Sequence, residues 1–232
     1  MSGIEAILAA VAGELSWGEP PPVFIGGATI GLYLDDFARA HLRTTKDVDC
    51  IVPAVVTTMQ WFALERELQQ RGWSPDRDGP ICRYRSPSGH VVDLLARDPS
   101  VQGFSGTWFQ AAVKNAEPRA LAGGSSVLVP KVPWLLACKI EAYNDRGARD
   151  PMASADLEDI VALLDGCRDL AAQVEAADAD VRALVSHWFT ALAANASLLE
   201  IVVAQLPEGG ADASRRRHFL RQVHRLAALT PS

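Results

Sequence analysis

Two aspartates on alternate positions of a short apolar run constrain the fold of this chain more than any other feature. Asp47 and Asp49 are separated by one apolar residue and lead into Cys50-Ile51-Val52. The alternation predicts a β-strand, in which residues i and i+2 project from the same face. Two like charges held this close repel each other unless a cation lies between them. The simplest cation is Mg²⁺, which binds carboxylate oxygens together with the phosphates of a nucleotide.

A glycine turn precedes this strand. Val23-Phe24-Ile25 predicts a short buried strand that ends at Gly26-Gly27, and the apolar spacing from Ala28 to Phe37 predicts a helix. Residues 38–46 then form a basic connector to the acidic strand. A glycine turn at the start of a helix lets the backbone approach a phosphate, with its N–H groups and the helix dipole facing the anion. The alternative is an ordinary tight turn.

A third carboxylate, Asp93, lies within the apolar run Val91–Leu95. A carboxylate in an apolar strand is costly unless it is paired or bound to a metal. If this strand lies beside the Asp47 strand, the three carboxylates can hold a pair of Mg²⁺ ions. Such a pair would bind a triphosphate, activate an attacking hydroxyl and stabilise the leaving pyrophosphate.

The rest of the first half reads as a mixture of strands and helices. Residues 81–85 and 91–95 predict an antiparallel hairpin around the turn Ser86-Pro87-Ser88-Gly89. Residues 54–71 predict a helix with Met59, Phe62, Ala63 and Leu68 facing inward. Further expected elements are helices over 3–16 and 104–113 and a strand over 127–129.

The amino-acid composition changes near residue 130, and Ala and Leu dominate the rest of the chain. Helices are expected over 132–143, 155–164, 170–177, 181–194, 197–206 and 213–229. We therefore expect an α/β (α+β) architecture with a small mixed sheet flanked by helices in domain 1–130, followed by a helical domain, 131–232.

Composition excludes several classes of protein. The chain has 232 residues and a formal net charge of −6, which argues against broad, sequence-blind coating of nucleic acid. It has no run of about 18 apolar residues and no basic, apolar leader, so we expect a cytoplasmic protein that does not bind membranes. The four cysteines are scattered and predict buried free thiols rather than a zinc site or a disulfide framework.

The order of these motifs resembles the polymerase-β-like nucleotidyltransferases. That pattern is a Gly-Gly or Gly-Ser turn after a strand, a helix, Asp-x-Asp on the next strand and a third Asp on a later one. The longer form Gly26-Gly27-Ala28-Thr29 … Arg43-Thr44-Thr45-Lys46-Asp47-Val48-Asp49 is similar to the AbiEii branch, the toxins of AbiE-type and MenA-type toxin–antitoxin systems. The resemblance covers about residues 23–165.

The resemblance implies a nucleotidyltransferase fold and assigns further residues to the site. The branch carries a helical lysine and a downstream aspartate, which match Lys139 and Asp156, with Asp159 as a second acidic position. Lys139 would contact the nucleotide phosphates, and Asp156 would hold that lysine or the substrate. Gly26, Gly27, Arg43 and Thr45 would help to bind the nucleotide. Residues 166–232 have no counterpart in the pattern.

Several of these residues also have simpler interpretations. Lys139 could be a surface lysine with a buried stem, and Asp156 could be a first-turn acid that favours the helix dipole, with Ser154 as N-cap. Arg43 could neutralise nucleotide phosphates or only offset the acidic pair.

Simpler interpretations also exist for Asp93, for the two arginines at 83 and 85, and for the basic helix near residue 220. Asp93 alone could be an N-cap or part of a buried salt bridge. Arg83 and Arg85 share a strand face that lines a substrate groove or simply faces solvent. The basic helix from Arg215 to Arg225 could contact RNA or an acidic partner, or could be a solvated face.

The hypothesised reaction is the Mg²⁺-dependent transfer of a nucleoside monophosphate from an NTP such as ATP to an acceptor hydroxyl, with Mn²⁺ as the alternative metal. Asp47, Asp49 and Asp93 would bind the metal, and Asp93 could accept the proton of the acceptor. By resemblance, the acceptor is tRNA or a protein, and a cognate antitoxin is a partner. The alternatives are nucleotidylation of a small molecule, as in aminoglycoside-modifying enzymes, and a non-catalytic nucleotide-binding module.

Overall fold

The computed structural model of the chain describes residues 3–103, 106–207 and 212–229. It divides into two compact units. Unit 1 comprises Met1–Thr29 and Thr44–Lys131, and unit 2 comprises Ile30–Arg43 and Val132–Ser232. The expected division near residue 130 differs from this one in the segment Ile30–Arg43, which belongs to the helical unit.

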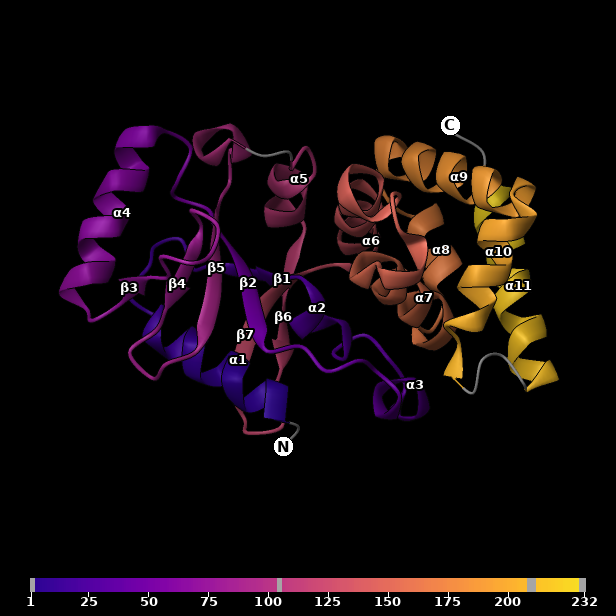
Figure 1. The fold of residues 1–232 in the computed structure, drawn as a ribbon, viewed down its shortest axis with the longest axis horizontal. Helices are drawn as coiled ribbons and strands as arrows, with labels where there is room; N and C mark the ends of the chain where they lie inside the picture. Colours follow the sequence, from indigo (N-terminus) through magenta and orange to yellow (C-terminus); the bar gives the residue numbers. More distant parts are fainter. Residues whose placement is uncertain (1–2, 104–105, 208–211, 230–232) are drawn as a thin grey trace. The chain divides into compact units, whose positions relative to one another are not determined.

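Unit 1 is built on a seven-stranded mixed sheet with the strand order β3-β4-β5-β2-β1-β7-β6 (Figure 1). The pairs β2–β5 and β1–β7 are parallel, and the other neighbours are antiparallel. A mixed α/β architecture is therefore confirmed. The strands are β1 (Val23–Ile25), β2 (Asp47–Val52), β3 (Ser74–Pro75), β4 (Arg83–Arg85), β5 (Val91–Ala96), β6 (Ala116–Ala120) and β7 (Ser126–Pro130).

The central strands form the core of unit 1 because their inward side chains are large and apolar. Val48, Ile51, Val92 and Leu94 have no exposed surface. The predicted hairpin is confirmed, since β4 and β5 flank a turn in which the Gly89 N–H donates to the Ser86 carbonyl at 2.8 Å. The strand β6 was not predicted. Its sequence Ala-Glu-Pro-Arg-Ala lacks the apolar alternation typical of a strand.

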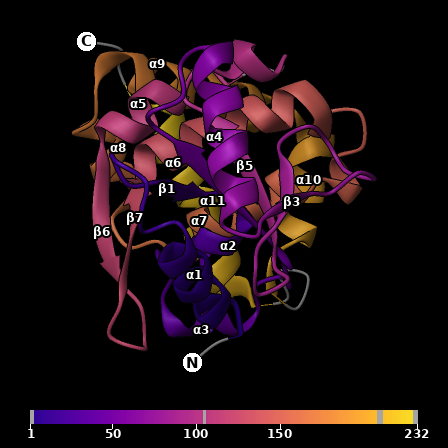
Figure 2. The ribbon, with the colours of Figure 1, turned by 90° about the vertical axis from the view of Figure 1, so that its left-hand side faces the viewer.

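Helices α1 (Gly3–Glu14), α4 (Thr58–Gln70) and α5 (Phe109–Lys114) accompany the sheet (Figure 2). Of the expected helix 104–113, residues 104 and 105 lie outside the described residues. Thr57 caps α4 by accepting a hydrogen bond from the Gln60 N–H at 3.3 Å. The buried stripe of α4 is Trp61, Leu64 and Leu68.

The predicted inward face of α4 is wrong for three residues, because Met59, Phe62 and Ala63 are exposed. Packing against the sheet sets the rotation of the helix instead. Trp61 lies edge-on to Tyr84 of β4, with ring centroids 6.2 Å apart. The Tyr84 hydroxyl also donates to Glu65 of the same helix at 2.8 Å.

The predicted helix from Ala28 to Phe37 is also wrong. Helix α2 (Gly27–Ile30) has four residues, and α3 (Asp36–Ala40) begins separately after Asp35, whose carboxylate accepts a hydrogen bond from the Ala38 N–H. Gly31 has a poor helix propensity, and Asp35 caps a new helix rather than continuing the old one. A helix as short as α2 has little dipole, so the expected dipole contribution at Gly26-Gly27 is lost.

Unit 2 is helical, and the expected helices are all present. They pack around fully buried side chains that include Leu135, Leu136 and Ile140 on α6 and Phe189 on α9. Besides α3, the helices are α6 (Val132–Ala142), α7 (Ala155–Gly166), α8 (Leu170–Glu175), α9 (Ala179–Ala194), α10 (Ala196–Ala204) and α11 (Ala213–Ala227).

A bilayer-spanning helix is not found among the described residues. No single helix there has the length and apolar composition to cross a membrane. Only α9 and α10 taken together reach that length and composition, and they are bent by 100° to each other.

Candidate active site

The predicted site residues fall into two groups, one in each unit. In unit 1, Asp49 of β2 lies in parallel register with Asp93 of β5, and Asp47 lies two residues earlier on β2. Residues in register, and residues two apart on one strand, project from the same face of a sheet. The sheet therefore brings Asp47, Asp49 and Asp93 onto one face. We call these three side chains, together with Arg83, the carboxylate row.

Arg83 completes this row from the neighbouring strand. It lies opposite Asp93 in the antiparallel β4–β5 pair. Its Nε donates to Asp93 Oδ1 at 2.8 Å and its Nη2 to Asp93 Oδ2 at 2.7 Å, while Nη2 also lies 3.5 Å from Asp47 Oδ2. Hydrogen bonding to Asp93 raises the pKa of Arg83 above its ordinary value. Asp93 thus forms a bidentate ion pair with the permanently charged guanidinium of Arg83.

The glycine turn lies directly against the carboxylate of Asp49. Gly26 has a φ of +79°, a conformation that side chains rarely adopt. A Cβ atom at this position would also overlap Oδ2 of Asp49. Ile25 is the register partner of Asp49, which explains the close approach. Gly26 is therefore required both by backbone conformation and by the space that the carboxylate occupies.

The solvent exposure of the carboxylates changes along the row. The side chain of Asp47 is 46% exposed, whereas that of Asp93 is 11% exposed. The Thr45 hydroxyl donates to Asp47 Oδ1 at 2.9 Å and so fixes the orientation of the more open carboxylate. The open end of the row is where a ligand can approach it.

In unit 2, Lys139 of α6 is buried between two carboxylates of α7. Its Nζ lies 3.1 Å from Asp156 Oδ1 and 2.6 Å from Asp159 Oδ2. The side chains of Lys139, Asp156 and Asp159 are 9%, 6% and 0% exposed. The predicted contact of Lys139 with Asp156 is present, and the interpretation of Lys139 as a surface lysine is wrong.

Two arginines extend this group into a charged network, which we call the lysine cluster. Arg43 donates to both oxygens of Asp159 at 3.1 Å and lies 3.5 Å from Glu158. Arg146 donates to Asp156 at 2.8 and 3.2 Å. Burial opposes ionisation of Asp156, but Lys139 and Arg146 outweigh burial and lower its pKa.

Local sequence explains how α7 presents its two acids. Ser154 caps the helix by accepting a hydrogen bond from the Leu157 N–H at 3.2 Å, so Asp156 and Asp159 lie in the first turns, three residues apart on one face. Gly147 ends the π-helical turn Tyr143–Gly147, and a side chain there would overlap Ser154 Oγ. The turn and the cap thus fit together only with glycine.

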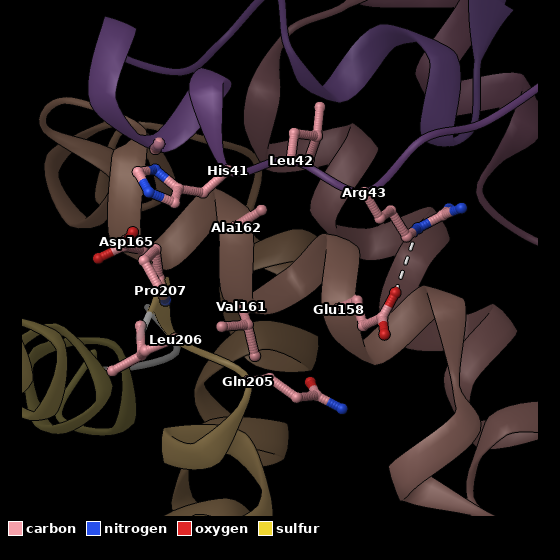
Figure 3. A pocket seen from close by; sticks show the side chains of 11 residues that line it. His41, Leu42, Arg43, Glu158, Val161, Ala162, Asp165, Gln205, Leu206 and Pro207 are labelled. Atoms are coloured by element: carbon pink, nitrogen blue, oxygen red, sulfur yellow. Dashed lines mark ion pairs between the residues drawn. The ribbon is translucent and has the colours of Figure 1, made fainter. Parts of the chain in front are cut away.

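A cavity of about 350 Å³ lies beside the lysine cluster within unit 2. Figure 3 shows Arg43 and Glu158, which form an ion pair, on one wall, and His41 and Asp165 on the other. Val161 lines the cavity between them. Arg43 was predicted to contact nucleotide phosphates or to offset the acidic pair; in the structure its ion pairs are with Asp159 and Glu158.

The donor chemistry of the carboxylate row fits a hard divalent cation, because Asp47, Asp49 and Asp93 offer carboxylate oxygens on one face. Its present arrangement is not that of a metal site. Over the described residues, no group of three or more His, Cys, Asp or Glu side chains is placed to hold a metal ion. Within the row, both oxygens of Asp93 are held by Arg83.

The cysteines do not supply an alternative chemistry. All four are free and buried. Burial raises the pKa of Cys138 to about 12, so its thiol is a poor nucleophile at neutral pH.

Neither a protein-family model nor a curated protein sequence matches this chain. The roles of Gly26, Gly27, Thr45 and Lys139 in nucleotide binding are therefore still predictions.

Arg83 is the site residue whose role the sequence left open, between a substrate groove and a solvated face. The predicted hairpin does not by itself give this pairing, because counting outward from the turn Ser86–Gly89 would place Arg83 opposite Val92. In the structure the Ser86 N–H donates to the His90 carbonyl, and this register places Arg83 opposite Asp93. Opposite charges directly across an antiparallel pair attract, which stabilises the observed register.

Proposed function

We propose that the chain is a Mg²⁺-dependent nucleotidyltransferase of the polymerase-β-like type, which moves a nucleoside monophosphate from an NTP to an acceptor hydroxyl. The observation that carries this proposal is the register of Asp49 with Asp93 on one sheet face, with the Gly26 turn against Asp49. A strand-end glycine turn, an Asp-x-Asp strand and a third aspartate on the neighbouring strand are the parts of the family pattern that the geometry supports.

In this proposal, Asp47 and Asp49 would hold the cation, and Asp93 would complete the site when Arg83 releases it. The cation would neutralise the triphosphate and lower the charge on the leaving pyrophosphate. Gly26 leaves room for the Asp49 carboxylate, so that this side chain keeps its place in the row. Arg83 is a counter-ion for the row, and its guanidinium is suited to contact phosphate once a metal has replaced it.

Asp93 can accept the proton of the acceptor only in that second arrangement. In the structure, both of its oxygens accept hydrogen bonds from Arg83. The proton transfer step thus requires the Asp93–Arg83 pair to open. The acceptor proposed from the family resemblance is tRNA or a protein in the cytoplasm, with a cognate antitoxin as partner.

The experiment is transfer of label from each α-³²P NTP, with Mg²⁺ or Mn²⁺, to total tRNA or to lysate protein. Asp49→Asn should lower transfer by at least about a hundredfold, because it removes a charged ligand of the proposed cation. Asp78→Asn changes an exposed aspartate of the same unit and is the matched control. Equal transfer by wild type and D49N would show that the row is not the reaction site.

A second function is favoured by one observation, the closed Asp93–Arg83 pair. If that pair does not open, the chain binds nucleotide without transferring it. Nucleotide binding measured by calorimetry, with no labelled product for any NTP, would identify this non-catalytic module.

A further inference from the structure

Helix α11 carries an unusual charge for this chain. It contains five arginines, at 215, 216, 217, 221 and 225, and no acidic residue. The chain as a whole has 22 basic and 28 acidic residues, which leaves 17 basic against 28 acidic residues elsewhere. A polyanion is therefore repelled by most of the chain and attracted by this helix.

The basic side chains gather on one face. At 100° per residue, Arg217, Arg221, Arg225, His218 and His224 fall within an arc of roughly 120°. Each of these five is exposed. The opposite face carries Phe219, Val223 and Leu226, which are fully buried. Packing of the apolar face fixes which way the arginines point.

These arginines are available to a partner. Among the described residues, Arg217, Arg221 and Arg225 make no ion pair and no side-chain hydrogen bond. They are at i, i+4 and i+8, so they recur about every 6 Å along the helix axis. Arg215, by contrast, pairs with the buried Asp165 and fixes the beginning of the helix to α7.

An exposed aromatic side chain lies at that end of the helix. The guanidinium of Arg215 lies 4.2 Å from the ring centroid of Phe37, which is 47% exposed. Phe37 in turn stacks on His41 with ring centroids 4.4 Å apart. Arg215 and His41 thus already lie against the Phe37 ring, away from the arc of Arg217, Arg221 and Arg225. Helix α11 carries arginines and no lysine, and guanidinium groups both pair with phosphates and stack on bases, which matches a nucleic acid strand better than an acidic protein.

We infer that the exposed face of α11 binds the phosphate backbone of single-stranded RNA. The planar guanidinium group of arginine can donate two parallel hydrogen bonds to phosphate oxygens. This binding adds to the proposed transfer reaction and does not require it, because the surface lies wholly on unit 2 side chains and is measured without nucleotide.

The test is fluorescence anisotropy of a labelled single-stranded RNA of about 16 nucleotides, over a range of salt concentrations. R217Q/R221Q/R225Q should bind at least about tenfold more weakly at low salt, and its log–log salt slope should be shallower by about 2. Glutamine has a similar helix propensity, so circular dichroism should be unchanged. Substitution of the same three residues by lysine should keep the salt slope, since the charge remains.

The matched control removes three exposed arginines from other parts of the chain, as R66Q/R77Q/R168Q. It should bind RNA within about twofold of wild type. Equal losses in the two triple variants, or no loss in the α11 variant, would overturn the inference. Binding of poly-glutamate but not RNA would also overturn it and would point to an acidic protein partner. D49N, which tests the transfer reaction, should bind this RNA as wild type does.

Discussion

The carboxylate row and the lysine cluster both join acids to arginines, but they differ in how the charges balance. The four side chains of the row are three aspartates and Arg83, with a net charge of −2. The lysine cluster has three cations, Arg43, Lys139 and Arg146, and three carboxylates, Asp156, Asp159 and Glu158. The cluster is neutral over its six side chains, whereas the four side chains of the row carry an excess of negative charge.

The lysine cluster and the carboxylate row also differ in how deeply their charged side chains are buried. Asp159 is fully buried, and Lys139 and Asp156 nearly so, which is tolerable only because each charge has a close partner. The row keeps Asp47 half-exposed, where water screens its charge. The comparison indicates that the cluster chiefly stabilises unit 2, and it favours the row as the reactive site that we propose.

The largest expected effect is loss of a partner inside the lysine cluster. Asp159→Asn should lower the free energy of unfolding by about 3–5 kcal/mol, because it leaves Lys139 and Arg43 without a buried counter-ion. Urea denaturation measures this loss. Glu158→Gln, which alters the half-exposed acid next to it, should change stability by less than about 1 kcal/mol. Similar losses in the two variants would contradict the proposed role of burial.

Loss of Arg83 from the carboxylate row should have a smaller effect on stability, and the size of this effect should depend on Mg²⁺. Arg83→Gln should lower stability by about 2 kcal/mol, since Asp93 loses a charged hydrogen-bonding partner. Added Mg²⁺ should restore part of this loss, as the cation takes the place of the guanidinium. The readout is the thermal midpoint with and without Mg²⁺.

Arg85→Gln is the matched control for this variant. Arg85 is on the same strand but pairs with Asp76, away from the row. Its variant should show no stabilisation by Mg²⁺ beyond that of wild type. If R83Q and R85Q respond alike to Mg²⁺, Arg83 is not holding the place of a cation.

Glycine substitutions separate backbone strain from contact with Asp49. Gly26 and Gly89 have similar positive φ angles, +79° and +86°, but only a Cβ at Gly26 meets a neighbouring atom. Gly26→Ala should therefore cost about 1–2 kcal/mol more than Gly89→Ala, because the Asp49 carboxylate must move. Equal unfolding free energies for G26A and G89A would show that the turn does not constrain Asp49.

The smallest expected effect is on acid stability. The pKa of Asp156 is lowered in the folded state, so its contribution is fully present above its ordinary value of 3.8 and is lost as pH falls through the lower folded value. Between pH 5 and pH 3, wild type should therefore lose more stability than Asp156→Asn. Urea midpoints at the two pH values measure the difference. A larger loss of stability in D156N than in wild type would contradict a lowered pKa for Asp156.

Local patterns predicted much of this fold. The hairpin around Ser86–Gly89 and the helices of unit 2 follow from turn residues and apolar spacing over a few positions. The helix from Ala28 to Phe37 failed because Gly31 and Asp35, which break it, were outweighed by the apolar residues around them. The rotation of α4 failed because Trp61 packs on Tyr84, a contact that depends on the sheet.

The site was predicted unevenly for the same reason. Asp47 and Asp49 share a face by their spacing alone, but the register of Asp49 with Asp93 joins strands 44 residues apart and depends on the whole sheet. The pairing of Arg43 with Asp159 links positions 116 residues apart, and no local signal marks it. The Arg83–Asp93 pair depends on the exact register of its hairpin, which differs by one residue from a count outward from Ser86–Gly89.

Titration with Mn²⁺ in the absence of NTP, followed by the loss of the free-ion electron paramagnetic resonance signal, tests the central claim most directly. Wild type should bind Mn²⁺, D49N should bind it at least about tenfold more weakly, and D78N should match wild type. R83Q should bind it more tightly, because the guanidinium no longer competes for Asp93. Equal Mn²⁺ binding by wild type and D49N would contradict the assignment of the carboxylate row as the metal and reaction site.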